Sequence, residues 1–408
     1  MTELTGAVVV GGNLNGLSIA RSLGRRGVPV WVVSTPNIRL ASFSRYTRRT
    51  VQWPSGSDED QVGFLLDLAA RNRLDRWVLF PTSDESAALL SKYHTQLSSR
   101  FRVSTPDWNA LKWAYDKRLT YRLAEQQQVD YPATFYPRSE SDLDSVTFPA
   151  ILKPATHACV NRFTAAKAWA VANREELLCR YVEARSLMPA DQILVQERIR
   201  GGGKCQFSYA ALCRGGKPIA SLTARRTRQF PFDFGYSSSF VETMNVPDIV
   251  APSLRLLDAM KYTGIVEIEY KFDARDGRFK LLDINPRLWT WAPLGARAGV
   301  DFPLLLWRLM LDMPVPELTA PPGVAWVRMS TDVPAAIHEM LRGRLNPFSY
   351  LCSLRSPLEF ALFAADDPLP GLLDLPLFAF KHLHNRFGNL RKGVPSEGQS
   401  EGRYSVKS

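Results

Sequence analysis

Cysteine is scarce in this sequence of 408 residues, and the few cysteines present form no pattern. They are odd in number, scattered, and include no CxxC pair: Cys159, Cys179, Cys205, Cys213 and Cys352. Neither a disulfide framework nor a structural zinc site has this spacing. We therefore expect reduced thiols with no catalytic role.

Long apolar runs are missing as well. A membrane-spanning helix needs about 18 consecutive apolar residues, whereas even the run 304–313 is interrupted by Arg308 and Asp312. The opening MTELTGAVVVGG lacks the basic segment that precedes the apolar part of a signal peptide. We expect a cytoplasmic protein with no transmembrane segment.

The chain has no complete dinucleotide fingerprint. The segment GGNLNG at 11–16 follows an apolar stretch but lacks the G-x-G opening. The next apolar stretch ends in Ser34 and Thr35, where an NAD site needs an acid for the ribose hydroxyl. A structural turn is the better interpretation, and an NAD(P)-dependent oxidoreductase is the least favoured function.

Acidic residues are absent from one strongly basic stretch. Residues 21–50 hold seven arginines and no acid, and residues 381–408 hold six Lys or Arg against two Glu. These excesses of +7 and +4 sum to the net charge of +11, so the rest of the chain is neutral. We expect surfaces that are solvated or face an anionic partner, and no nucleic-acid groove.

The first 107 residues alternate between strand and helix patterns. Strands are predicted at 6–12, 28–34 and 75–85, and a helix at 14–25. Such alternation predicts a parallel sheet with crossover helices. Because 408 residues exceed one compact core, further domains should follow.

A strand-rich region comes after a helical pattern at 108–128. The strands predicted in it, with one helix at 174–185, are 149–155, 192–199, 206–213, 217–226, 264–272 and 278–287. Beyond 315 the pattern weakens into an appendage at 316–392, and the polar, Gly/Ser-rich segment 393–408 is predicted to be a disordered tail.

Acidic side chains gather on the last two of these strands. Glu267 and Glu269 share one strand face, and Asp283 and Asn285 share a face of the next, because side chains alternate along a strand. The turn ARDG at 274–277 would bring the two strands together as a hairpin. Their oxygens then suit Mg²⁺ that bridges nucleotide phosphates, with Glu269 favoured over Glu267.

The alternative is that these acids are merely solvent-facing strand positions, which alternation would also produce. The continuation argues against it, because Asn285 is followed by Pro286 and Arg287, which puts a guanidinium beside the acids. Cation-binding acids with an anion-binding arginine suit phosphoryl transfer better than a plain surface.

The stretch 264–287 resembles the metal-binding end of the ATP-grasp ligases, whose pattern is an acid-ending strand, a turn, and a strand that finishes in Glu-x-Asn-x-Arg. Within that superfamily it is most similar to carboxylate-amine ligases related to D-aspartate ligase and carbamoyl-phosphate synthetase. The similarity covers residues 6 to about 315. It implies a mixed α/β and α+β protein, with a Rossmann-like pre-ATP-grasp domain at 1–107 and a two-lobed ATP-grasp core at 108–315.

The resemblance also implies roles for individual residues. Lys117 and Lys153 would contact ATP phosphates, and the hinge at 196–203 would hold the adenine, largely by main-chain groups around Gln196, Glu197 and Ile199. Mg²⁺, or Mn²⁺ in its place, would be bound by Glu269, Asp283 and Asn285. Arg287 would stabilise the transferred phosphoryl group. Arg225 and Arg226 should point to opposite faces of their strand, so one of them, or Arg228, would reach phosphate or substrate carboxylate, unless this is an edge strand kept soluble by charge.

Three departures from the family pattern stand out. No glycine lies between Lys153 and Gly201, although the family closes a Gly-rich loop over the phosphates there. His157, Asn161 and Arg162 would have to serve instead. Lys204 and Gln206 stand where an acid usually holds the ribose, and Asp283 replaces the usual Glu.

The predicted function is an ATP-dependent ligase that joins a small-molecule carboxylate to an amine, or to a thiol, through an acyl phosphate and ADP. An ATP-binding regulator or adaptor without turnover is the alternative, suggested by the missing glycines and the basic ends. The sequence is compatible with a homo-oligomer. It does not identify the carboxylate or the amine substrate.

Overall fold

The computed structural model describes residues 4–36, 39–156, 161–230 and 237–374. By internal contacts the chain divides into a compact unit at 1–361 and a second unit at 362–408. The predicted tail at 393–408 lies outside the described residues. The domain boundaries at 107 and 315 stay predictions.

A five-stranded parallel sheet forms the N-terminal part of the first unit, with the strand order β3-β2-β1-β4-β5. The strands are β1 (Ala7–Val10), β2 (Val30–Ser34), β3 (Thr47–Gln52), β4 (Val78–Pro81) and β5 (Arg102–Val103). The elements between them are α1 (Leu14–Gly24), η1 (Leu40–Phe43), α2 (Asp58–Asn72), α3 (Asp84–Lys92) and α4 (His94–Leu97). The predicted parallel sheet is confirmed.

The GGNLNG turn after β1 has a packing reason for its glycines. Gly11 has a φ of 121°, and a Cβ there would lie 1.8 Å from the Thr82 hydroxyl oxygen. A Cβ on Gly16 would lie 2.2 Å from the Gly11 carbonyl oxygen. The Asn13 side chain caps α1 by accepting from the Gly16 N–H. These contacts make it a tight strand-to-helix turn.

The single helix predicted at 108–128 is wrong, because the chain forms two helices there. These are α5 (Trp108–Tyr115) and α6 (Lys117–Gln126). Between them Asp116 has an extended backbone, and its carboxylate accepts from the Arg118 N–H as the cap of α6. The competing capping bond breaks the helix. As a result Lys117 stands in the first turn of α6.

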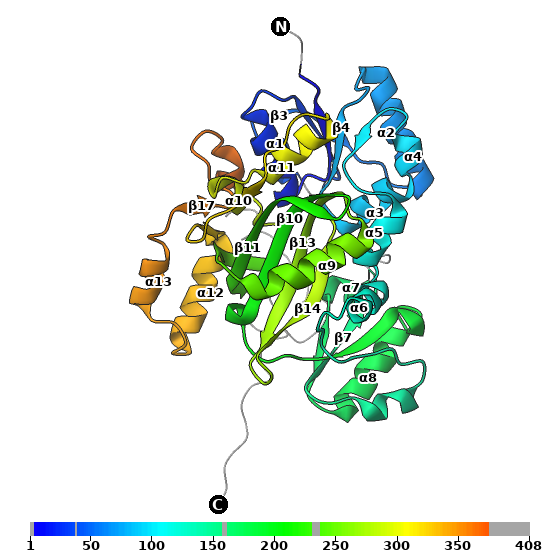
Figure 1. Cartoon of the computed structure of the whole chain (residues 1–408), viewed down its shortest axis with the longest axis vertical. Helices are drawn as coiled ribbons and strands as arrows, with labels where there is room; N and C mark the ends of the chain where they lie inside the picture. The colour runs from blue at the N-terminus through cyan, green and yellow to red at the C-terminus, as the bar shows by residue number, and fades with distance from the viewer. Residues whose placement is uncertain (1–3, 37–38, 157–160, 231–236, 375–408) are drawn as a thin grey trace, which may run out of the picture. The chain divides into compact units, whose positions relative to one another are not determined.

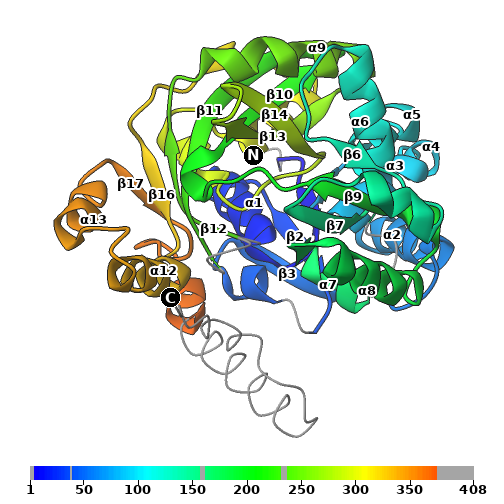
Figure 2. The ribbon, with the colours of Figure 1, turned by 90° about the horizontal axis from the view of Figure 1, so that it is seen from below.

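A four-stranded antiparallel sheet follows, in the order β6-β9-β7-β8. Its elements are β6 (Thr134–Phe135), η2 (Glu140–Ser145), β7 (Ala150–Pro154), α7 (Arg162–Ala166), β8 (Trp169–Val171), α8 (Arg174–Arg185), η3 (Ala190–Gln192) and β9 (Ile193–Glu197). Figure 2 shows α7 and α8 beside β7. Leu177 and Tyr181 of α8 pack on Val195 of β9 in one buried cluster.

The largest sheet has the order β14-β13-β10-β11-β12-β16-β17, with β15 paired to β11. Its elements are η4 (Gly203–Cys205), β10 (Gln206–Arg214), β11 (Lys217–Phe230), β12 (Ser237–Thr243), η5 (Pro247–Ile249), α9 (Val250–Met260), β13 (Gly264–Asp273), β14 (Arg278–Asn285), α10 (Pro293–Arg297), α11 (Phe302–Met310), β15 (Leu318–Thr319), β16 (Ala325–Val327), α12 (Met329–Leu341), α13 (Pro347–Ser353) and β17 (Leu358–Phe360). Figure 1 shows α9 lying across this sheet, where Leu256 and Leu257 pack on Val266 and Ile268 of β13.

The predicted hairpin of β13 and β14 is confirmed, with Glu269 opposite Asp283 and Glu267 opposite Asn285. Side chains alternate along β13, and Val266 and Ile268 pack toward α9. Glu267 and Glu269 therefore point to the opposite face of the sheet. In the described part of the chain, no helix is long and apolar enough to cross a membrane.

Candidate active site

Two neighbouring cavities lie where the sheets of the first unit meet. The first, of about 230 Å³, is lined by acids of β13 and β14, by Lys117 and Lys153, and by Asp84 of α3. The second, of about 410 Å³, is lined by the hinge strand β9 and the loop after it. Lys153, Ala168, Gln206 and Leu282 line both, so the two cavities share a wall. We call them the acid cavity and the hinge cavity.

The carboxylates of β13 are held by neighbours on adjacent strands. Glu269 lies 2.6 Å from the Arg226 guanidinium of β11. Asn285 of β14 donates to Glu267 at 3.1 Å and to Glu269 at 3.0 Å. Ser208 of β10 donates to Glu267 at 2.9 Å. Burial and the charge of Glu269 raise the pKa of Glu267 to about 7.

Lys117 reaches the acid cavity because the helix break turns it toward β14. Its ammonium donates to both oxygens of Asp283, at 2.8 and 2.7 Å. The Lys117 side chain is 10% exposed and the Asp283 side chain 29%, so this ion pair is partly shielded from water. The fold thus brings together a cation from α6 and a carboxylate from β14 that are 166 residues apart in the sequence.

Lys153 stands at the junction of the two cavities. Its ammonium donates to the Gln196 side-chain oxygen at 2.9 Å, and the Gln196 amide donates to Thr134 at 2.9 Å. Burial, reinforced by the charge of Lys117, lowers the pKa of Lys153 to about 8. Among the described residues, this half-buried ammonium donates to a neutral amide and to no carboxylate, so it is well placed to receive an anion.

The other predicted hinge residues line the hinge cavity. Gln196, Glu197 and Ile199 all border it. The Glu197 carboxylate pairs with Arg275 at 2.5 Å, which fixes β9 against the β13–β14 hairpin. Gln206 lines both cavities, and its side-chain oxygen has no hydrogen-bond partner among the described residues.

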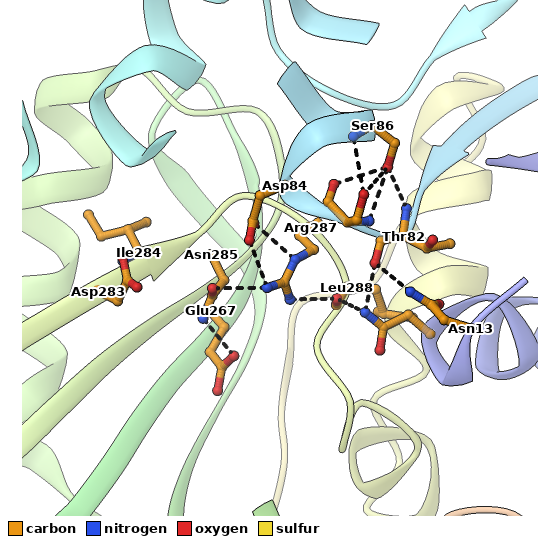
Figure 3. A network of polar contacts seen from close by, with 12 residues as sticks. Asn13, Thr82, Asp84, Ser86, Glu267, Asp283, Ile284, Asn285, Arg287 and Leu288 are labelled. Carbon is orange, nitrogen blue, oxygen red and sulfur yellow. Dashed lines mark hydrogen bonds and ion pairs between the residues drawn. The ribbon is translucent and has the colours of Figure 1, made fainter. Parts of the chain in front are cut away.

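Arg287 joins the acid cavity to the N-terminal sheet. Figure 3 shows its guanidinium between Asp84, Asn285 and the Leu288 carbonyl. It contacts the two Asp84 oxygens at 2.9 and 3.1 Å and donates to the Asn285 side-chain oxygen at 3.2 Å. Sequence reasoning missed Asp84, because its partner is 203 residues away.

Arg226 and Arg228 pair with different acids, although they stand two positions apart on β11. The pairing of β11 with β12 shifts register at this point, and both arginines are buried. Arg226 faces Glu269 in the acid cavity. Arg228 instead pairs with the fully buried Asp332 of α12 at 2.7 Å. The structure does not bring Arg228 to the other predicted site residues.

The glycine-free segment between Lys153 and Gly201 brings a lysine to the acid cavity, and not the residues that were predicted there. Asn161 caps α7 and Arg162 pairs with Glu183 at 3.0 Å, and neither lines the acid cavity. His157 lies outside the described residues. Lys167, with a φ of 60°, lines that cavity and is exposed to solvent. No sequence signal distinguished this lysine.

The fold resembles those of known proteins. No family model matches the chain. Over 310 residues it is 24% identical to D-aspartate ligase of Enterococcus faecium (strain Aus0004), across 69% of this chain and 70% of that protein. Its fold is similar to that of an L-amino acid ligase from Bacillus licheniformis, with a TM-score of 0.59 and 14% identity over 76% of this chain and 75% of that one. The chain has the ATP-grasp fold.

A further structure of similar fold is a nucleotide complex. It is the biotin carboxylase domain of 2-oxoglutarate carboxylase from Hydrogenobacter thermophilus, solved with MgADP, ADP and bicarbonate. The TM-score is 0.62 at 12% identity, over 78% of this chain and 73% of that one. The predicted fold class and the predicted relationship to ATP-grasp ligases are confirmed.

The Lys153 ammonium should make nucleotide binding depend on pH. Its folded-state pKa of about 8 lies below its ordinary value of 10.5. As the pH rises through the folded value, the side chain loses its charge, and ATP affinity should fall by up to about tenfold per pH unit. Between the two values the unfolded chain binds this proton more tightly, so this lysine makes folding stability rise with pH, not fall.

Calorimetric titration with MgATP at stepwise higher pH checks this dependence. The Lys153→Arg variant stays charged throughout and should flatten the profile. An unchanged slope in that variant would assign the pH dependence to another group.

Proposed function

We propose that this protein is an ATP- and Mg²⁺-dependent ligase that joins a small-molecule carboxylate to an amine, or to a thiol, through an acyl phosphate. The observation that carries the proposal is the shared wall between the two cavities, where Lys153 borders both. A nucleotide with its base in the hinge cavity would extend its phosphates past Lys153 toward the acids of β13 and β14.

The nucleotide would be held along its whole length. Main-chain groups of the segment from Gln196 to Ile199 would contact the base, and Gln206, which borders both cavities, would contact the ribose. Lys117, Lys153 and Lys167 would neutralise the phosphates. Lys167 would take the place of the glycine loop, because a lysine gives a phosphate a compact point charge.

The donor set of the acid cavity fits Mg²⁺. Within the described residues, no three His, Cys, Asp or Glu gather as a ready-made metal centre. Mg²⁺ rarely needs one, because it prefers hard oxygens and takes one or two carboxylates together with phosphate and water. Glu269, Asp283 and Asn285 offer two carboxylates and an amide oxygen on facing strands. Bound there, the ion would neutralise phosphate charge.

Transfer would proceed without a protein nucleophile. A substrate carboxylate oxygen would bond to the γ-phosphorus as the bond to the β-phosphate oxygen breaks, which releases ADP. The amine nitrogen would then bond to the carbonyl carbon, lose a proton, and displace phosphate. Arg287 lines the cavity with its fork held by Asp84, and would stabilise the charge that develops on the phosphoryl group and the tetrahedral oxyanion.

The test is product analysis by mass spectrometry after incubation with ATP, Mg²⁺ and pooled amino acids and metabolites, with phosphate release measured in parallel. We expect a ligated product and equimolar phosphate. Thermal stabilisation should appear with MgATP or MgADP and not with NAD, NADP or FAD. Stabilisation by NAD(P) alone would refute the proposal, and tight ATP binding without turnover would favour the adaptor.

A further inference from the structure

The outer face of α12 is apolar and is left uncovered by the described residues. Its exposed side chains recur every four residues, which puts them on one side of the helix: Met329, Val333, Ile337 and Leu341. Ile337 is 52% exposed and Leu341 is 83% exposed. A helix that is apolar on its outer side as well as its inner side is normally buried, so this face indicates a binding partner.

The inner side of α12 is fixed to the large sheet. Ala335 and Ala336 are buried, and the fully buried Asp332 pairs with Arg228 of β11 at 2.7 Å. Rotation of the helix would break this buried ion pair and leave both charges without a partner, which is strongly unfavourable. The apolar outer face is therefore held toward solvent and cannot turn inward.

The next helix adds further exposed apolar side chains. Figures 1 and 2 show α13 beside α12. Phe348 of α13 is 68% exposed and Leu351 is 60% exposed. Single exposed apolar side chains are normal, whereas a group of large ones on neighbouring helices marks an interaction site. We call the exposed side chains at 329–351 the α12–α13 surface.

The charges next to the α12–α13 surface are mainly positive. Residues 340–358 contain three exposed arginines and no acid: Arg342, Arg344 and Arg355. Glu339, just before this stretch, pairs with Arg344 at 3.8 Å, so positive charge remains in excess. In its sequence the segment 375–392, which lies outside the described residues, likewise has four Lys or Arg, seven large apolar residues and no acid.

These charges decide between the possible occupants. A second copy of the chain across a two-fold axis would place the same arginines opposite one another. The segment 375–392 would also bring only positive charge. An apolar surface with basic residues beside it is complementary to a bilayer that contains anionic lipids, because the bilayer offers both an apolar interior and negative headgroups.

We propose that the α12–α13 surface binds an anionic lipid bilayer. The apolar side chains would enter the boundary between headgroups and acyl chains, and the arginines would contact lipid phosphates. The segment 375–392 has the composition to contact the same bilayer. This inference goes beyond the proposed ligase function and does not depend on it.

Co-sedimentation of the full chain with lipid vesicles tests the inference. The protein should pellet with vesicles of phosphatidylcholine mixed with phosphatidylglycerol, less with phosphatidylcholine alone, and less at high salt. Ile337→Glu combined with Leu341→Glu should weaken binding to the mixed vesicles about ten- to hundredfold, because two apolar side chains are lost from the contact. Arg355→Gln should weaken it about fivefold.

Val182→Glu is the matched control, because Val182 is an apolar residue of α8 that is 50% exposed. It should bind the mixed vesicles like the wild type. Circular dichroism checks the fold of each variant, and Arg355→Gln tests the surface without a new charge in α12. Wild-type protein that pellets with neither vesicle would refute the proposal, as would unchanged binding by the Ile337→Glu, Leu341→Glu variant. A wild-type dimer that this variant dissociates in sedimentation velocity, without vesicle binding, would assign the surface to a second copy instead.

Discussion

Asp283→Asn should lower Mg²⁺-dependent turnover by about a thousandfold or more, because metal and charge placement supply most of phosphoryl-transfer catalysis. The substitution keeps the shape of a side chain that faces Glu269 across the hairpin and removes one negative charge. Glu269→Gln should act in the same direction, because it removes the other carboxylate. Both are measured as ATP-dependent phosphate release and ligation by folded protein.

Asp283 also holds Lys117, so a folding effect has to be separated from a catalytic one. Asp276→Asn serves as the control, since Asp276 belongs to the same hairpin and pairs with Lys280 outside the cavity. That variant should keep its activity. If Asp283→Asn and Glu269→Gln both retain near wild-type rates, the metal assignment is wrong, and the proposed ligase mechanism is wrong as well.

Arg287→Lys should be nearly as damaging, with turnover reduced about 10²- to 10³-fold. The guanidinium contacts both Asp84 oxygens while donating to Asn285, and a lysine ammonium cannot reproduce this planar fork. The loss should appear mainly in kcat, because the interaction strengthens as charge develops. Steady-state kinetics with circular dichroism as a fold check measures it.

Arg278→Lys is the matched control for this prediction. Arg278 begins the same strand, β14, and pairs with Asp130 away from the cavity. Asp84→Asn adds a second test, because loss of its anchor should lower kcat while Arg287 stays charged. Activity of Arg287→Lys equal to that of Arg278→Lys would remove Arg287 from the reaction.

Much of the site could be predicted because it is encoded locally. Strand alternation aligned Glu267 with Glu269 and Asp283 with Asn285, and a short turn forced the two strands into one hairpin. The predicted strands at 149–155 and 192–199 likewise pair as β7 and β9, which brings Lys153 to Gln196. The roles given to these residues remain predictions, since position alone does not show what they bind.

Local patterns failed where hydrogen bonds competed or strands lost register. The helical pattern at 108–128 ran through Asp116, whose side chain caps a new helix instead. Strict alternation puts Arg226 and Arg228 on one face, yet beside the register shifts of β11 one pairs with Glu269 and the other with Asp332. Neither outcome could be predicted from spacing.

The sequence by itself determined the strand and helix pattern, the acidic hairpin and the resemblance that links them to ATP chemistry, because each depends on neighbours in the chain. Only the tertiary structure decided that Lys117 meets Asp283 and that Asp84 holds Arg287. Partners separated by 166 and 203 residues meet only when whole sheets pack, and periodicity carries no information about that packing.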